Sequence, residues 1–280
     1  FTRRLMHMTS SSSAPRLSLL TAYRRRESHL KVLLPWLARI RDEEGFTDFE
    51  VILAEGEERP TAAATCAEQY DWVRYLHVEM PGRFHKSVLL NRAYEVSRGE
   101  FLIHLDADLL PARGVLARHL MLAAESPRCL MTGYRIQLPW MLDAKSALPT
   151  SEEISHILTT DDTPFEKMVC SEDDITTLCK YLLKGERFGV CPCLPRKAYE
   201  AVGLTHEGYL GWGGEDQDLI ESICDQGLSM VRSYDLLYFH LPHEHESEWA
   251  DPALLAENRK LFAARREERQ RLRDSRAGSL

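Results

Sequence analysis

The sequence predicts an α/β protein built on a mostly parallel sheet with helices on both faces. Apolar, strand-like runs alternate along the chain with helix-like segments of about 10 to 15 residues, which is typical of βαβ units. Polar clusters follow three of these runs directly. The length of 280 residues allows one large α/β domain or two small ones.

The first half of the chain supplies four predicted strands and two predicted helices. Helices are expected where apolar residues recur at helical spacing, at 28–42 with Ser28 as cap, and at 86–99 ended by Gly99. Strands are expected at short apolar or alternating runs, at 16–23, 49–54, 73–79 and 100–111. A polar loop is expected directly after the second of them. The last of these runs is almost continuously apolar until it ends in two aspartates and a proline.

The second half begins with an acidic, polar region, 134–186, which we expect to be an insertion across the sheet or a lid over a cleft, with helical pieces near 152–158 and 172–183. After this region we expect strands at 186–194 and 229–241 and helices at 195–203 and 215–226. A solvated helix is expected from Pro252, fraying near Gly278. The predicted organisation is a disordered tail or cloning remnant (1–14), one domain (15–250) and a helical tail (251–280).

Composition excludes several classes of function. The net charge is −8 without a face-sized basic cluster, which argues against nucleic-acid binding. No run of 18 apolar residues occurs, and the start of the chain lacks the apolar region of a signal peptide. Seven cysteines show no disulfide spacing, so we expect free thiols in a reducing compartment. The expected location is the cytoplasm, with peripheral membrane association as an option.

Polar clusters at strand ends are the first functional signal, because open parallel sheets bind ligands beyond the carboxyl ends of their strands. TAYRRR, AEGEE and DAD follow the first, second and fourth predicted strands. Arg24, Arg25 and Arg26 suit a diphosphate or nucleotide, or else form a solvated charge run. Lys86 begins a helix and could contribute to the same site, or be an ordinary surface lysine.

Two further motifs suggest a metal. Asp106 and Asp108 share a face if the chain is extended there, so both could reach one hard cation; a surface turn is the alternative. The stretch FHLPHEH places His240, His243 and His245 within six residues, and we expect at least one of them to be a ligand. A histidine beside an aspartate favours Mn²⁺ over Mg²⁺.

The stretch GWGGEDQD (211–218) gathers three glycines, a tryptophan and three carboxylates. Gly213 and Gly214 permit a hinge, and Trp212 could stack on a sugar. Glu215 and Asp216 begin a helix whose dipole helps to keep them ionised, so either is a candidate general base for a hydroxyl. The structural alternative is a glycine turn followed by an acidic helix start.

Together, these motifs resemble one family. TAYRRRESHL, FHKSVLLNRAY, HLDADLLP, FGVCPCLPRKAYEAVG and GWGGEDQDL occur in the order and spacing of the β-1,4-galactosyltransferases and their bacterial relatives, over residues 16–245. The resemblance implies a GT-A fold with a single Rossmann-like sheet. It also implies an inverting transfer of a sugar from a UDP-sugar that depends on Mn²⁺ or another divalent cation.

The resemblance also assigns roles to individual residues. The nucleotide would lie along Ala22, Tyr23, Arg24 and Arg26, with Glu55 near the uracil or ribose. Asp106 and Asp108 would form a DXD motif in which Asp108 binds the metal with His240 or His243. Trp212 and Gly213 would belong to a loop that closes over the substrates, and Glu215 and Asp216 would hold the acceptor, with Asp216 as base.

The sequence departs from this family at two motif positions, where Leu210 replaces an aromatic residue and Gln217 an acidic one. The donor class is therefore left as UDP-Gal, UDP-GalNAc or UDP-GlcNAc, and the acceptor as a glycan, peptide or small molecule. Two alternatives remain: a retaining enzyme like the polypeptide N-acetylgalactosaminyltransferases, and a non-catalytic nucleotide-sugar or glycan-binding module.

Overall fold

A computed structural model describes residues 14–138, 141–146, 190–211, 213–243 and 251–277. The first half of the chain contains β1 (Leu17–Tyr23), α1 (Glu27–Glu44), β2 (Phe49–Glu57), α2 (Ala62–Ala67), β3 (Val73–Glu79), α3 (Lys86–Val96), β4 (Phe101–His104), β5 (Leu109–Pro111) and α4 (Val115–Glu125). The remainder contains β6 (Cys129–Gln137), β7 (Val190–Pro195), α7 (Arg196–Ala201), α8 (Glu215–Cys224), β8 (Ser229–His240) and α9 (Pro252–Ala277).

The described strands form one eight-stranded sheet in the order β3-β2-β1-β4-β7-β6-β8-β5. Strands β3, β2, β1 and β4 run parallel, as does the pair of β6 and β8. The strand β7 is antiparallel to both of its neighbours, and β5 is antiparallel to β8. The predicted α/β class with a mostly parallel sheet is therefore confirmed.

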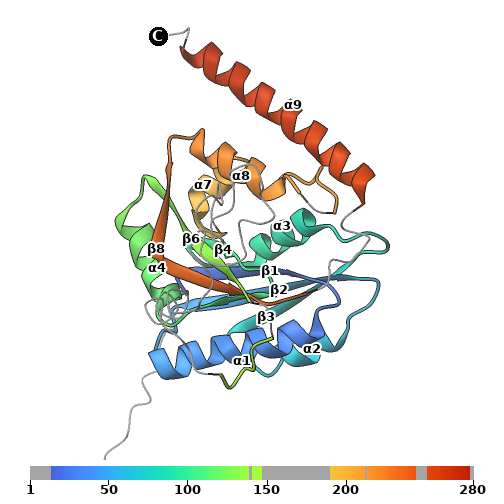
Figure 1. Ribbon diagram of the computed structural model, residues 1–280, viewed down its shortest axis with the longest axis vertical. Coiled ribbons are helices and arrows are strands. Elements are labelled where there is room, and N and C mark those ends of the chain that lie inside the picture. The colour runs from blue at the N-terminus through green and yellow to red at the C-terminus, as the bar shows by residue number, and fades with distance from the viewer. Residues whose placement is uncertain (1–13, 139–140, 147–189, 212, 244–250, 278–280) are drawn as a thin grey trace, which may run out of the picture.

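Alternating side chains of the central strands build a core on each face of the sheet. On β1, Leu17 and Leu19 pack with apolar residues of α1 and α4, whereas Leu20 and Ala22 pack with those of α3, α7 and α8. Because successive side chains of a strand point to opposite faces, one apolar run serves both layers. Figure 1 shows the same arrangement, with α1 and α2 below the sheet and α3, α7 and α8 above it.

Several predicted boundaries are wrong, each for a local physical reason. Arg26 rather than Ser28 precedes α1, and no side chain caps that helix. The predicted strand 100–111 is broken into β4 and β5, since the chain turns at Ala107 and Asp108. The helix α3 ends at Val96, and Gly99 instead lets the chain pass close to β1, where a Cβ would lie 2.5 Å from Ser18 N.

Other elements were extended or missed. The strand β2 continues through Glu57, into the predicted polar loop. The helices α2 and α4 and the strand β6 were not predicted. The helical pieces expected near 152–158 and 172–183 lie outside the described residues, as does most of 134–186.

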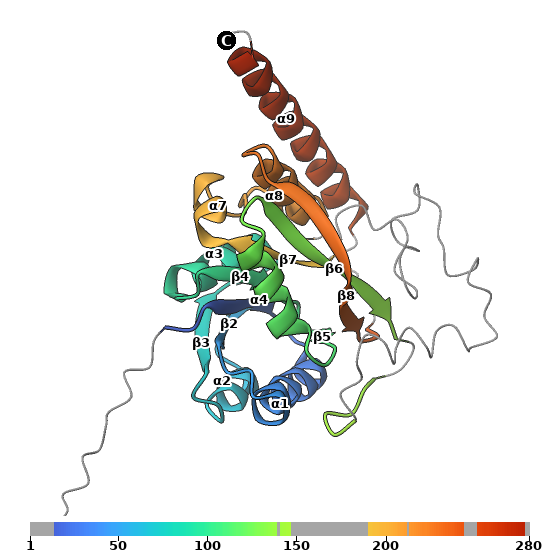
Figure 2. The same cartoon turned by 90° about the vertical axis from the view of Figure 1, so that its left-hand side faces the viewer.

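The C-terminal helix α9 is present as predicted, but one of its faces packs on α8 (Figure 2). Within the described part of the chain, no helix combines the length and apolar character needed to cross a bilayer.

Candidate active site

Segments from six elements meet at the carboxyl ends of the central strands. The segment 24–26 follows β1, residues 105–108 connect β4 to β5, and His240 ends β8. Lys86 begins α3, and Glu215 and Asp216 begin α8. This is the sheet edge at which the sequence predicted ligand binding, and the ion pairs among these residues divide into two groups.

The first group is a candidate metal centre. One ligand atom from each of Asp108, His240 and His243 lies within 4.8 Å of the others. The Nε2 atom of His243 is 3.3 Å from Asp108 Oδ2, and that of His240 is 3.8 Å from Asp108 Oδ1. Metal–ligand bonds to histidine and carboxylate are about 2.0–2.2 Å long, so these separations are close to those of ligands that share one ion.

The chemistry of this group fits a divalent transition metal. Burial is the main reason that the pKa of His240 is lowered to about 4, so its imidazole is neutral at physiological pH, which is the form that binds metals. The Nδ1 atom of His240 is buried and has no hydrogen-bond partner among the residues that the structure describes. Two imidazoles and one carboxylate form a donor set that suits Mn²⁺ and its neighbours. His240 and His243 therefore belong to one group, whereas the third candidate, His245, lies outside the described residues.

His29 supports this group and was missed in the sequence. It is buried in the first turn of α1, its ring lies edge-on to His243, and its Nε2 donates to the carbonyl of Pro242 at 3.1 Å. This bond fixes the segment that carries His243. His29 lies in the stretch TAYRRRESHL, three residues after Arg26, so its place in this motif was a usable signal.

The second group surrounds Lys86, whose side chain is 15% exposed. Its Nζ lies 3.1 Å from Asp106 Oδ1, 3.1 Å from Asp216 Oδ2 and 3.9 Å from Glu215 Oε1. Burial acts to lower the pKa of Lys86, but the three carboxylates outweigh it and raise the pKa well above its usual value. Lys86 is thus a largely buried cation that joins Asp106 to the start of α8.

Asp106 and Asp108 do not share a face, contrary to the prediction from an extended chain. The turn between β4 and β5 directs Asp106 to Lys86 and Asp108 to the histidines and Arg26. Burial acts to raise the pKa of Asp106, but Lys86 more than compensates and lowers it. The two aspartates therefore link the two groups, with Asp108 alone in the candidate metal centre.

Glu215 and Asp216 are neighbours in different environments. Glu215 is 5% exposed, and burial together with Asp216 raises its pKa to about 7. The side chain of Asp216 is 53% exposed. The N–H of Gly213 donates to Glu215 Oε2 at 3.1 Å, so Glu215 holds the loop that contains Gly211, Gly213 and Gly214, called the glycine loop below. Asp216 instead faces solvent and Lys86.

The glycines before these acids have a conformational reason to be there. Gly211, Gly213 and Gly214 have φ values of 73°, 105° and 99°, in the region that side-chain-bearing residues rarely adopt. Trp212 lies outside the described residues.

The predicted nucleotide-binding residues lie at the same edge with several of their polar groups engaged. Ala22 and Tyr23 end β1 and are buried. Arg24 donates to the carbonyls of Gly56, Met80 and Gly82, so it secures the segment before Lys86.

The side chains of Arg26 and Glu55 are held as well. Arg26 Nη1 donates to Asp108 Oδ2 at 2.9 Å, next to the candidate metal centre. Glu55, two residues before the end of β2, accepts hydrogen bonds from the hydroxyls of Tyr75 and Thr61 and from Thr61 N at 3.0 Å. These contacts fix Glu55 in place.

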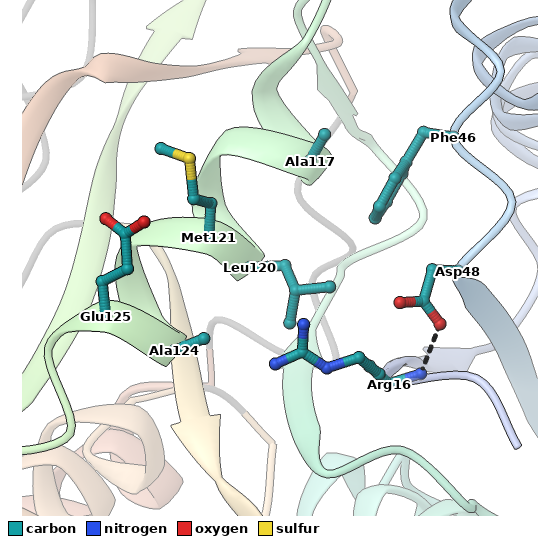
Figure 3. A pocket seen from close by; sticks show the side chains of 8 residues that line it. All are labelled: Arg16, Phe46, Asp48, Ala117, Leu120, Met121, Ala124 and Glu125. Atoms are coloured by element: carbon teal, nitrogen blue, oxygen red, sulfur yellow. Dashed lines mark hydrogen bonds between the residues drawn. The ribbon is translucent and has the colours of Figure 1, made fainter.

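A separate pocket of about 370 Å³ lies at the opposite end of the strands (Figure 3). Arg16, Phe46, Asp48 and residues of α4 line it, and Arg16 N donates to Asp48 Oδ1 at 2.8 Å. Since Arg16 precedes β1, this pocket is remote from the carboxyl ends of the strands, and the site described above does not include it.

Comparisons with known proteins agree with this geometry. The model of glycosyl transferase family 2 matches residues 19–182, more than half of the chain. A model described as the N-terminal domain of galactosyltransferase matches residues 175–244, which include GWGGEDQD. No curated protein sequence matches the chain.

Solved structures of S. aureus TarS resemble the fold. The crystal structure of TarS 1–349 in complex with UDP-GlcNAc aligns with a TM-score of 0.62 at 14% identity, covering 89% of this chain and 66% of that one. The structure of TarS 1–349 without a named ligand gives 0.59 at 15% identity, and the complex with UDP gives 0.58 at 14%. The chain spans 65% of the TarS 1–349 structure without a named ligand.

The sheet and its flanking helices form a domain of the GT-A fold, and the family match makes it a glycosyltransferase domain. The chain belongs to glycosyl transferase family 2. The finer resemblance to the β-1,4-galactosyltransferases is supported in part, by the galactosyltransferase match over the second half of the site.

Proposed function

We propose that this protein transfers a sugar from a UDP-sugar to an acceptor hydroxyl with inversion, using a divalent cation, preferably Mn²⁺, and Asp216 as general base. One observation carries the proposal: Lys86 joins Asp106 of the DXD segment to Asp216, so a donor site and a candidate base lie side by side. The TarS relative crystallised with UDP-GlcNAc supports a UDP-sugar donor.

In the donor site, Asp108, His240 and His243 would hold the metal, which when bound offsets negative charge on the UDP leaving group. Arg26 and Lys86 add positive charge beside the expected diphosphate. Glu55 is proposed to contact the uracil or ribose beyond β2, close to Ala22 and Tyr23. A direct nucleotide contact by Arg24, and the closing of Trp212 and Gly213 over the sugar, stay predictions.

In the acceptor site, Asp216 would take the proton of the acceptor hydroxyl as the hydroxyl oxygen attacks the anomeric carbon, while the bond between that carbon and the UDP oxygen breaks and UDP leaves. Asp216 suits this role better than Glu215, because its carboxylate is half exposed and can reach a hydroxyl, whereas Glu215 is buried and bound to the backbone of the glycine loop. Lys86 Nζ donates to Asp216 Oδ2 at 3.1 Å, which holds this carboxylate at the opening of the site.

The test is a pair of variants assayed for UDP release and UDP binding with Mn²⁺ across a screen of UDP-hexoses and acceptors. We expect Asp216→Asn to lower turnover about 10²–10⁴-fold, the usual contribution of a general base, and to keep UDP affinity. Asp108→Ala should instead lose metal-dependent UDP binding. Normal turnover of Asp216→Asn would show that the base is wrongly assigned.

The same assay separates the alternatives. A product with retained anomeric configuration would indicate a retaining enzyme. Failure to release UDP with any donor and acceptor, with binding intact, would indicate a nucleotide-sugar or glycan-binding module.

A further inference from the structure

The third carboxylate of GWGGEDQD does not face the site. Asp218 is 1% exposed, and its two oxygens accept hydrogen bonds from Arg265 Nε and Arg269 Nη1 of the C-terminal helix α9. A buried carboxylate is costly unless it is paired and hydrogen-bonded, and here one arginine meets each oxygen. Asp218 therefore joins the helix of the candidate base to the end of the chain.

These contacts extend along both helices. Arg269 also donates to Glu221 Oε2 at 2.8 Å and lies 3.2 Å from Asp225 Oδ2, and Arg273 pairs with Asp225. Arginines four residues apart on α9 thus face acids three to four residues apart on α8 and at its C-terminal cap, Asp225, which places each set on one side of its helix. Figures 1 and 2 show α9 running over α8 and continuing beyond it.

The same helix also holds the chain before the glycines. Asn258 is 3% exposed; its side chain donates to the carbonyl of Leu210 at 2.9 Å and accepts from the N–H of Leu210 at 3.3 Å. A Cβ placed on Gly213 would lie 3.0 Å from Leu255 Cδ1, so α9 is also in close contact with the loop itself.

A third contact reaches the Lys86 segment. Asp251, directly before α9, accepts a hydrogen bond from Arg83 Nη2 at 3.1 Å. Arg83 lies three residues before Lys86, in the segment that Arg24 also secures. The helix α9 therefore touches the chain before the glycine loop and after it, and Asp251, which precedes this helix, touches the segment that leads to Lys86.

We propose that α9 is a brace that sets the position of Asp216 relative to Lys86, with Asn258 and Arg269 as positioning residues. Three glycines with positive φ cannot by themselves fix the start of α8, because glycine adopts many backbone conformations at similar energy. Anchors on both sides of the glycines remove this freedom. The inference rests on the proposed role of Asp216, since misplacing a catalytic group by about 1 Å can cost roughly 10²-fold in rate.

The test compares Arg269→Gln with Arg271→Gln, a matched change at an exposed arginine of the same helix. For Arg269→Gln we expect kcat for Mn²⁺-dependent UDP release from UDP-hexoses to fall about 10- to 100-fold, while the Kd for UDP with Mn²⁺ stays within about twofold. Amide exchange in peptides of 215–224 should become faster, with that of 17–23 unchanged. Arg271→Gln should match the original protein in all three measurements.

Two further variants guard against simple misfolding. Arg269→Lys keeps the charge beside Asp218 and should recover part of kcat, and Asn258→Ala should reproduce the loss through the other anchor. The proposal is overturned if folded Arg269 and Asn258 variants keep kcat and amide exchange unchanged. If Asp216→Asn itself keeps turnover, the proposed base is wrong, and amide exchange in 215–224 alone decides whether α9 is a brace.

Discussion

Glu215 and Asp216 are adjacent in the sequence but differ in burial and in their contacts. Glu215 is buried beneath the glycine loop, and burial together with its neighbour raises its pKa to about 7, whereas Asp216 is half exposed beside Lys86. Helix geometry turns adjacent side chains by about 100°, so one carboxylate enters the core and the next faces the site. Two like residues can therefore have separate roles, one holding the loop and one acting as base.

The pKa of Glu215 predicts how stability depends on pH. A carboxyl whose folded pKa lies above its unfolded value of 4.5 binds its proton more tightly in the folded state. Its contribution is therefore complete below about pH 4.5 and is lost as the pH rises through about 7. We expect Glu215→Gln to abolish this loss. The free energy of unfolding of the variant should therefore increase relative to that of the original protein between pH 5 and 8.

Urea unfolding at several pH values measures this difference. Glu267→Gln, a change at an exposed carboxylate on α9, is the matched control and should leave the profile unchanged. Parallel profiles for Glu215→Gln and the original protein would mean that Glu215 titrates normally.

At the scale of elements, close contacts between segments decide where strands and helices end. The strand expected over 100–111 breaks because Asp106 and Asp108 turn toward different partners. Gly99, expected to end a helix, instead lies against β1: its N–H donates to Ser18 Oγ at 2.8 Å. Ser18 Oγ in turn donates to the buried Glu50.

Gly99→Ala should therefore destabilise the fold without touching the site. The added methyl would meet backbone and side-chain atoms of Ser18 at 2.5–2.6 Å, and β1 is central in the sheet and cannot move away. Overpacking of this kind costs about 1–3 kcal/mol. We expect a lower urea midpoint at an unchanged m-value, with normal UDP affinity in the folded protein; an unchanged midpoint would contradict this account of the contact.

At the scale of the whole molecule, the site exists only when distant segments meet. Asp108 and His243 are separated by 135 positions in the sequence, yet their ligand atoms lie 3.3 Å apart. The carboxyl ends of the parallel strands bring them to one edge of the sheet, and β8 arrives beside β5 with His240 opposite Leu109. Ligand binding at this edge should therefore stabilise the whole domain.

We expect UDP to raise the melting temperature in the presence of Mn²⁺ and to do so far less in EDTA. A ligand at about 100 times its Kd adds roughly 2.7 kcal/mol, or on the order of 5–10 °C for a domain of this size. In Asp108→Ala the shifts with and without Mn²⁺ should become equal. Equal shifts in the original protein would show that UDP binds without a metal.

The sequence was sufficient to predict those parts of the fold and the site that depend on local patterns, and insufficient for those that depend on distant contacts. Strands β1, β3 and β8 and helix α8 were predicted closely, because their apolar patterns are local. The α/β class followed from their alternation. The short helix α2 and the residues His29, Asn258 and Arg269 were not singled out, because contacts with segments far along the chain give them their importance.

The α/β class and the glycosyltransferase class could be predicted from periodicity and motifs, because these are properties of neighbouring residues. The finer resemblance to the β-1,4-galactosyltransferases is supported in part. The tertiary structure was needed to show that Asp106 and Asp108 have different partners and that Glu215 is buried while Asp216 is half exposed. It also showed that Asp218 is bound to the C-terminal helix. The physical reason is that burial and charge pairing depend on what lies across the molecule, and sequence spacing does not record that.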